Sequence, residues 1–357
     1  MLAPVLAAST TLEAVLQLGP LALLGFLYAQ RVRHCAAQGH PVPGWRQACF
    51  YGGFLTIAVA LTSLGHASQQ LLFAHMTEHL LLGDVAALLI VLGLTGPLIA
   101  PILRIPFFNR LRVLAHPLIA FPLWAIDLYV WHLPVLYEAA LRHTGIHALQ
   151  HVMFLGLGIN MWMCLFGPLP MPKWFGNAAK LGYIVAVRLT GTVLGNIFLW
   201  SGTVFYPFYI QGDAAWHISP IADQNIAGAV MMIEESFLTL GLLCWLFLRT
   251  AKEGEERQDL LDWARANGLE LSEERATRAV SAGRVSELRR RLQAGSIPAE
   301  PEPVESVADA LPAGALETGA RARETEVQRV PGRSQWPGDD ECEVDALQAR
   351  PGAHDSA

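Results

Sequence analysis

The sequence predicts an all-α polytopic membrane protein, a bundle of seven transmembrane helices with its N-terminus outside and its C-terminus in the cytoplasm. Three observations lead to this fold class. Hydrophobic residues make up 53% of the 357 residues and charged residues only 16%, which is too apolar for an average soluble protein. Seven apolar windows long enough to cross a bilayer occur in the first 249 residues, and Lys and Arg gather in alternate loops between them.

The apolar windows are separated by stretches rich in Gly, Pro and charged residues. About 20 helical residues cross a hydrocarbon core of about 30 Å. Ten-residue segments of alternating hydrophobicity, which a membrane β-barrel needs, do not occur in the sequence. The first window lacks the flanks of a cleaved signal peptide, so we interpret it as a retained helix. We expect spans at residues 12–30, 47–64, 76–102, 115–132, 147–166, 181–200 and 226–248.

Lys and Arg in the short loops predict the orientation, because positively charged loops stay on the cytoplasmic side. The loops after spans two, four and six contain only one Lys or Arg, Arg142, so we place these loops on the outer side. The starts of spans three, five and seven and the end of span four are expected at the outer face. The inner loops carry Arg31, Arg33, Arg46, Arg104, Arg110, Arg112, Lys173, Lys180, Arg249 and Lys252.

Charge is concentrated after residue 249, which divides the chain into three regions. Of the 31 acidic residues, 22 follow this point, so the net charge of −6 belongs to the C-terminal part and gives no reason to expect nucleic-acid binding by the core. We predict a seven-helix transmembrane domain at 1–249, a cytoplasmic amphipathic helical region at 250–295, and a disordered acidic tail at 296–357. The five cysteines are scattered singly, which argues against a thiolate metal site.

Two pairs of histidines point to a metal site. His75 and His79 begin span three and His147 and His151 begin span five, each pair four residues apart, so that both rings lie on one helical face. His132 ends span four at the same outer level. Imidazole is a common ligand of copper and zinc. We therefore predict a metal site at the outer membrane face that holds copper, with zinc as the alternative, formed by His75, His79, His132, His147 and His151.

Other polar residues within the spans need partners, because an isolated charge in a bilayer is costly. We predict an ion pair between Arg188 and Glu234. Asp127 lies below His132 and is placed to orient an imidazole. Asp223 begins span seven, and we favour a capping role on that helix over a role as an oxygen ligand. The aromatic residues of the last outer loop are interpreted as an interfacial belt: Phe205, Tyr206, Phe208, Tyr209 and Trp216.

Four segments together resemble the CtaG family of cytochrome c oxidase assembly factors. They are HMTEHLLL at 75–82, WHLPVLYEAAL at 131–141, the pair His147 and His151, and Asp223-Gln224 at the start of the last span. The resemblance covers residues 15–248. It implies a seven-helix bacterial inner-membrane protein that helps copper reach a haem–copper oxidase, with oxidase subunits and the lipid bilayer as partners. Gly83-Asp84 departs from the more apolar, proline-containing stretch expected there.

Two other functions remain open. A seven-helix membrane hydrolase would hold zinc with three histidines and use Asp127 or Glu78 as general base. A haem b electron carrier would need axial histidines on opposing helices. The leading hypothesis is a non-enzymatic assembly factor without catalytic residues.

Overall fold

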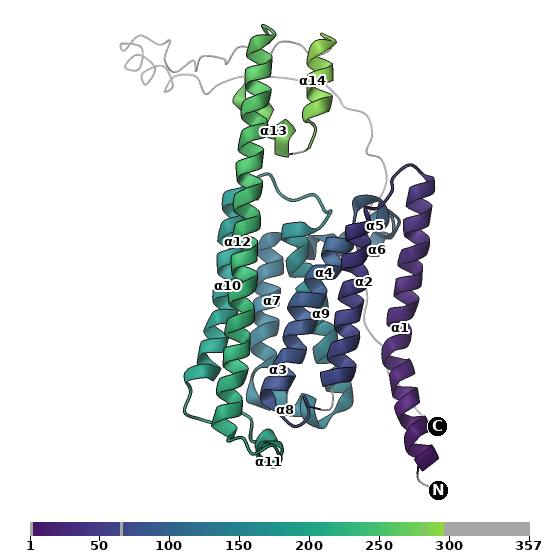
Figure 1. Cartoon of the computed structure of the whole chain (residues 1–357), viewed down its shortest axis with the longest axis vertical. Coiled ribbons are helices and arrows are strands. Elements are labelled where there is room, and N and C mark those ends of the chain that lie inside the picture. The colour runs from purple at the N-terminus through teal and green to yellow at the C-terminus, as the bar shows by residue number, and fades with distance from the viewer. Residues whose placement is uncertain (1–2, 65–66, 282, 296–357) are drawn as a thin grey trace, which may run out of the picture.

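The computed structural model describes residues 3–64, 67–281 and 283–295, and the predicted tail at 296–357 lies outside them. Every regular element among the described residues is helical (Figure 1). The first half of the bundle consists of α1 (Ala3–Ala37), α2 (Gly44–Val59), η1 (Ala60–Leu64), α3 (Leu72–Leu80), η2 (Leu81–Ala86), α4 (Ala87–Gly93), α5 (Gly96–Leu103), α6 (Pro106–Leu111) and η3 (Arg112–Ala115). The second half consists of α7 (Pro117–Trp131), α8 (Pro134–Arg142), α9 (Thr144–Phe166), α10 (Asn177–Trp200), η4 (Pro207–Tyr209), α11 (Ile210–Ala215) and α12 (Pro220–Ala266).

Five described helical segments are long and apolar enough to cross a membrane. They are Gly44–Leu64, Leu72–Gly93, Thr144–Phe166, Asn177–Trp200 and Pro220–Ala266, and a sixth is counted if the bent pair Pro106–Ala115 and Pro117–Trp131 forms one span. The first predicted span, residues 12–30, lies within α1 but is not among them. The chain is therefore a helical membrane protein, whereas the count of seven spans and the orientation of the termini stay predictions.

The third predicted span, residues 76–102, differs from the structure. The helix begins earlier, at Leu72, and ends at Gly93, after which Leu94 and Thr95 adopt extended backbone conformations before α5. Pro97, the second residue of α5, has no N–H group to donate to the carbonyl of Gly93, so one helix cannot continue unbroken through this point, whereas proline is well tolerated in the first turn of a new helix. The span contains a π-helical segment, η2, which carries the Gly83-Asp84 pair.

A close crossing at this pair depends on a glycine of the facing helix, Gly158, whereas a Cβ atom at Gly83 itself would make ordinary contacts of 3.6 Å or more. A Cβ atom added to Gly158 of α9 would lie 2.1 Å from the backbone oxygen of Gly83, so the two backbones meet without side chains between them. The crossing packs α9 against η2 and α4, and α7 and α10 complete the core around the fully buried Trp162. Helices α3 and α9, which carry the paired histidines, are thereby held in fixed register.

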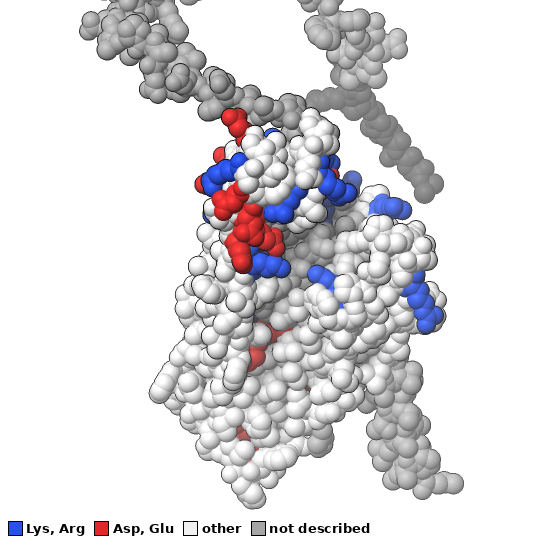
Figure 2. Space-filling view, turned by 45° about the horizontal axis from the view of Figure 1, so that its top comes forward, with Lys and Arg blue, Asp and Glu red and all other residues white. Residues whose placement is uncertain are grey.

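The last membrane helix continues past the predicted boundary at residue 249. Helix α12 has 47 residues, roughly 70 Å at 1.5 Å per residue, so it extends well beyond one bilayer. Its end packs against α13 (Glu273–Ser281) through Leu260, Leu261 and Ala276, and α14 (Val285–Gln293) follows. On the face in Figure 2, Lys and Arg, together with most of the visible Asp and Glu, gather around the end of the molecule that carries these helices. The opposite end of that face is nearly free of charge.

Candidate metal centre

The five predicted histidines lie close together at one end of the bundle, and we call them the histidine cluster. His75 and His79 project from α3, His147 and His151 from α9, and His132 follows the end of α7. Ring centroids are 4.3 Å apart for His75 and His79, 5.2 Å for His75 and His147, and 5.6 Å for His79 and His151. The ring of His132 is 6.3 Å from that of His79.

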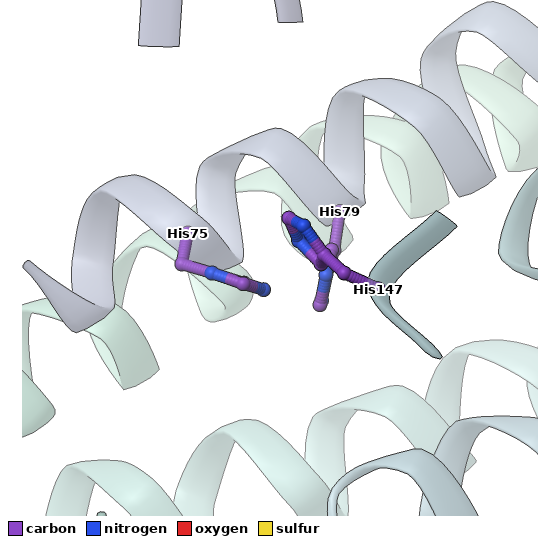
Figure 3. A group of neighbouring side chains, drawn as sticks. All are labelled: His75, His79 and His147. Atoms are coloured by element: carbon purple, nitrogen blue, oxygen red, sulfur yellow. The ribbon is translucent and has the colours of Figure 1, made fainter. Parts of the chain in front are cut away.

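Three of these histidines are close enough to share one ion. One ring nitrogen each from His75, His79 and His147 lie within 4.8 Å of one another. Figure 3 shows His75 and His79 on adjacent turns of one helix, with His147 reaching toward them from another element. His132 and His151 stand beside this triad, so the structure brings all five residues together but favours three as direct ligands. The presence of a metal ion remains a prediction.

Hydrogen bonds to backbone carbonyls orient two of the rings. Nδ1 of His75 lies 3.2 Å from the carbonyl oxygen of Ser68, and Nδ1 of His132 lies 2.6 Å from that of Leu128. A carbonyl only accepts hydrogen bonds, so Nδ1 carries the proton in both rings and Nε2 keeps its lone pair. A histidine that binds a metal through one ring nitrogen usually donates the N–H of the other to a carbonyl, a carboxylate or a water molecule, as these two rings do to carbonyls.

The lone pairs lie in a buried place without other partners. Among the described residues, Nε2 of His75, His79, His132, His147 and His151 has no hydrogen bond. His75 and His79 are exposed by 1% and 6%, whereas His147 and His151 are only partly buried. Buried polar atoms are usually satisfied, so this concentration of unsatisfied ring nitrogens is unusual and fits a bound cation. The cluster is open on the side of α9.

A carboxylate accompanies the cluster. Oε1 of Glu78, on the same helix as His75 and His79, lies 3.6 Å from Nε2 of His151. This is too long for a hydrogen bond but close enough for a favourable charge interaction if an ion binds. Asp127, in contrast, does not orient His132 through Nδ1, because the carbonyl of Leu128 occupies that position. The predicted role of Asp127 on this ring is therefore wrong.

Asp223 caps a helix, but not the predicted one. Its two carboxylate oxygens accept hydrogen bonds from the backbone N–H groups of Leu72, at 2.6 Å, and Phe73, at 3.0 Å. These are the first residues of α3, whereas α12 is capped by Ser219, whose side chain accepts from Ala222. Asp223 therefore fixes the start of the helix that carries His75 and His79. Burial and the neighbouring Asp223 raise the pKa of Asp213 in α11 to about 7.

Tyrosines form a wall beside the cluster that the sequence interpretation missed. Tyr206 and Tyr209 are each 2% exposed, so assigning them to an interfacial belt was wrong. The ring of Tyr137 lies 5.2 Å from that of His75 and 4.0 Å from that of Tyr206, and its hydroxyl is 3.3 Å from that of Tyr209. Burial raises the pKa of all three phenols, which keeps them neutral. Tyr206 and Tyr209 lie beside Pro207 in a loop, where a sequence alone suggests a surface position. Only contacts with distant residues such as Tyr137 reveal the wall.

A small cavity extends from the histidine cluster toward the middle of the bundle. It has a volume of about 40 Å³, enough for an ion or a water molecule but far below the roughly 300 Å³ of the smallest usual cofactor pockets, so it does not hold a haem. His79 and His132 line one part of it and Asp84 another. Met76 of α3 and Met231 of α12 also line the cavity.

Beyond the cavity lies a second polar group, the arginine cluster. Arg188 of α10 donates a hydrogen bond of 3.0 Å to Asp84 in η2. Its other terminal nitrogen lies 3.2 Å from Glu235 and 4.0 Å from Glu234. The predicted ion pair between Arg188 and Glu234 is confirmed, but Asp84 and Glu235 lie closer to the guanidinium. A guanidinium already occupies the space between them, which argues against a cation site there.

Comparisons with known proteins agree with the resemblance found in the sequence. The model of the family described as cytochrome c oxidase caa3 assembly factor (Caa3_CtaG) matches residues 26–253. This range contains the whole of both clusters. No curated protein and no solved structure matches the chain.

Proposed function

The chain belongs to the family of cytochrome c oxidase caa3 assembly factors, and on this basis we propose that it binds copper at the histidine cluster and passes it to an oxidase subunit. The observation that carries the proposal is the triad of His75, His79 and His147, whose ring nitrogens lie within 4.8 Å of one another. An assembly factor that delivers a metal needs such a site. In this role the protein binds and releases an ion and requires no catalytic residue.

The surrounding donors favour copper over zinc. Cu(I) prefers soft and imidazole ligands, and two thioethers, from Met76 and Met231, lie in the cavity wall with His79 and His132. Three neutral imidazoles leave a site that is less tightly closed than a thiolate cage. A donor of this kind releases its ion to a partner with stronger ligands.

The expected topology suits delivery from outside the cytoplasm. We infer that the end rich in Lys and Arg faces the cytoplasm of a bacterial cell and that the histidine cluster lies near the outer face of the inner membrane. In this arrangement α1 and α7 complete seven spans, and α6–η3 lies outside the span of α7. Copper then enters and leaves on the side of α9, where His147 and His151 are partly exposed.

Copper retention by the purified protein tests the site. The protein in detergent is equilibrated with Cu(I) and a competing chelator under anaerobic conditions, and its copper content is measured by elemental analysis. We expect one copper per wild-type chain and none in H75A/H79A. The matched control is H34A/H143A, which removes two exposed histidines outside the cluster. A folded H75A/H79A variant that keeps its copper would contradict the proposal.

The same analysis separates the remaining alternative. The three-histidine set with Glu78 close to His151 also fits a zinc hydrolase, in which a carboxylate activates zinc-bound water. Stoichiometric zinc in protein purified without added metal would favour that enzyme. A strain that lacks the chain is expected to lose oxidase activity and to regain part of it when copper is added.

A further inference from the structure

A second pocket opens at the other end of α7 from the histidine cluster. It has a volume of about 460 Å³, within the range of small-molecule sites, and lies between the α6–η3 segment and the loop that joins α9 to α10. Its polar lining comes from Asn109, Arg110, Arg112 and His116, and the turn at 169–172 forms the facing wall. The copper proposal does not involve this pocket.

The pocket carries positive charge that no acidic residue offsets. Arg110 and Arg112 are exposed, and neither forms an ion pair with any described residue. The two segments that build it, 104–116 and 167–180, contain five Lys or Arg residues and no Asp or Glu. The two segments are therefore basic, and they lie at the end of the molecule where most of the charged residues in Figure 2 gather. The pocket attracts an anion rather than a cation.

Hydrogen bonds to neighbouring elements hold the lining in place. Nδ1 of His116 accepts from the backbone N–H of Leu118, at 3.3 Å, so the proton of the neutral ring is on Nε2, which is a donor. On the other side, Asn160 of α9 donates to the carbonyl of Leu114, at 2.9 Å, and the thiol of Cys164 to that of Ala115, at 3.3 Å. The pocket thus offers two guanidinium groups, an imidazole N–H and an amide on an anchored segment. Guanidinium groups suit phosphate oxygens especially well.

The apolar surroundings identify the kind of anion. Residues 106–115 are bent by 80° from 117–131, so if α7 crosses the membrane, α6–η3 lies along its surface. The apolar side chains of this segment are open to the bilayer, with Phe107 exposed by 65% and Val113 by 57%. The exposed Trp174, whose ring is 5.9 Å from that of His116, is a typical residue of the membrane interface. A ligand with a phosphate group and hydrocarbon chains would contact both the basic lining of the pocket and the exposed apolar side chains of α6–η3.

We propose that this pocket binds the phosphate of an anionic phospholipid headgroup, with the acyl chains of the lipid along the apolar side of α6–η3. Basic pockets on the cytoplasmic side of membrane helices bind such headgroups. The lipid would anchor the α6–η3 segment at the membrane surface. The proposal is independent of the histidine cluster and of copper.

Lipid binding to the purified full chain tests the proposal. The probes are phosphatidylglycerol and phosphatidylcholine in the same detergent and inorganic phosphate at the same concentration, and bound lipid is counted by native mass spectrometry. We expect phosphatidylglycerol to bind the wild type in preference to phosphatidylcholine. R110Q/R112Q is expected to bind it about tenfold to thirtyfold more weakly, at roughly one factor of five per arginine.

The matched control is R33Q/R104Q, which removes the same charge from the same end of the molecule but outside the pocket lining. It is expected to bind phosphatidylglycerol like the wild type. Equal weakening in both double variants would show diffuse surface attraction and overturn the proposal. Competition by inorganic phosphate at the same concentration would assign the pocket to a soluble anion instead, which also overturns it. If R110Q/R112Q does not fold, R110K/R112K keeps the charge, loses the paired guanidinium geometry and is expected to bind several-fold more weakly.

Discussion

The histidine cluster and the arginine cluster lie on either side of one small cavity, yet their polar atoms are used in opposite ways. In the arginine cluster, Arg188 contacts three carboxylates and its guanidinium also lies 5.3 Å from the ring of the buried Trp162. In the histidine cluster, the five Nε2 atoms have no hydrogen-bond partner among the described residues. Buried charges that pair with one another are part of the fold, whereas ring nitrogens without a hydrogen bond are available to bind a ligand.

Local packing supports the same distinction. A Cβ atom at Gly191 would lie 2.0 Å from Oε1 of Glu235, so α10 needs a glycine there for the carboxylate to approach Arg188. The backbone of α10 is thus adapted to the ion pairs. Around the histidines, carbonyls of Ser68 and Leu128 hold the far side of two rings and leave the near side free. The comparison therefore supports a stabilising role for the arginine cluster and the proposed metal-binding role for the histidine cluster, and substitutions can separate the two roles.

The largest expected effect is that of Arg188→Met. Removal of the guanidinium leaves Asp84, Glu234 and Glu235 buried together without a counter-charge, which costs about 3–5 kcal/mol of folding free energy. Unfolding in detergent, followed by circular dichroism, measures this loss. The matched control is Arg249→Met, which breaks a partly exposed pair with Glu253 and is expected to cost at most about 1 kcal/mol. Equal losses in the two variants would remove the special role of the arginine cluster.

An intermediate effect is expected for His147→Ala. It removes one of the three ligand atoms that lie within 4.8 Å, and we expect Cu(I) affinity to fall by about a hundredfold, roughly 2.8 kcal/mol, with little change in folding stability. Competition with a Cu(I) chelator measures the affinity. His132→Ala is the comparison within the cluster, because its ring lies outside the triad, and a smaller loss is expected. A larger loss for His132 than for His147 would mean that a different set of rings holds the ion.

Much of this arrangement follows from short-range features of the sequence. Apolar windows placed the helices because burial in lipid demands about 20 apolar residues, and the spacing of four placed each histidine pair on one helical face. The pairing of α3 with α9 needed only the assumption that helix starts on one side of the membrane come together. What a single helix determines was therefore predictable.

The remaining features depend on contacts between distant parts of the chain. The partners of Arg188 come from η2 and α12, and the sequence alone predicts only one of them, Glu234, and not the closer Asp84 and Glu235. The burial of Tyr206 depends on the fold of its loop onto α8, with its hydroxyl bound to the carbonyl of His132 at 2.7 Å. No periodicity in the sequence records such contacts. Periodicity also does not indicate that Asp223 caps α3 rather than its own helix, α12.

The smallest expected effect, that of Asp223→Ala, tests whether one such contact between distant residues links stability to metal binding. Asp223 satisfies two N–H groups at the start of α3, so its loss is expected to cost about 1 kcal/mol of folding free energy. Because the freed first turn lies just before His75, Cu(I) affinity is also expected to fall, by about tenfold, as for other supporting residues of metal sites. Thermal unfolding and the chelator competition measure the two effects.

Ser219→Ala separates capping in general from capping of this particular helix. Ser219 caps α12, which carries none of the histidines in the cluster, through a hydrogen bond of 3.2 Å to the N–H of Ala222. Its loss should cost a similar ~1 kcal/mol of stability and leave Cu(I) affinity unchanged. If both variants lose affinity equally, metal binding responds to stability as a whole. If only Asp223→Ala does, the start of α3 positions the ligands, and the histidine cluster depends on a residue 148 positions away from His75 in the sequence.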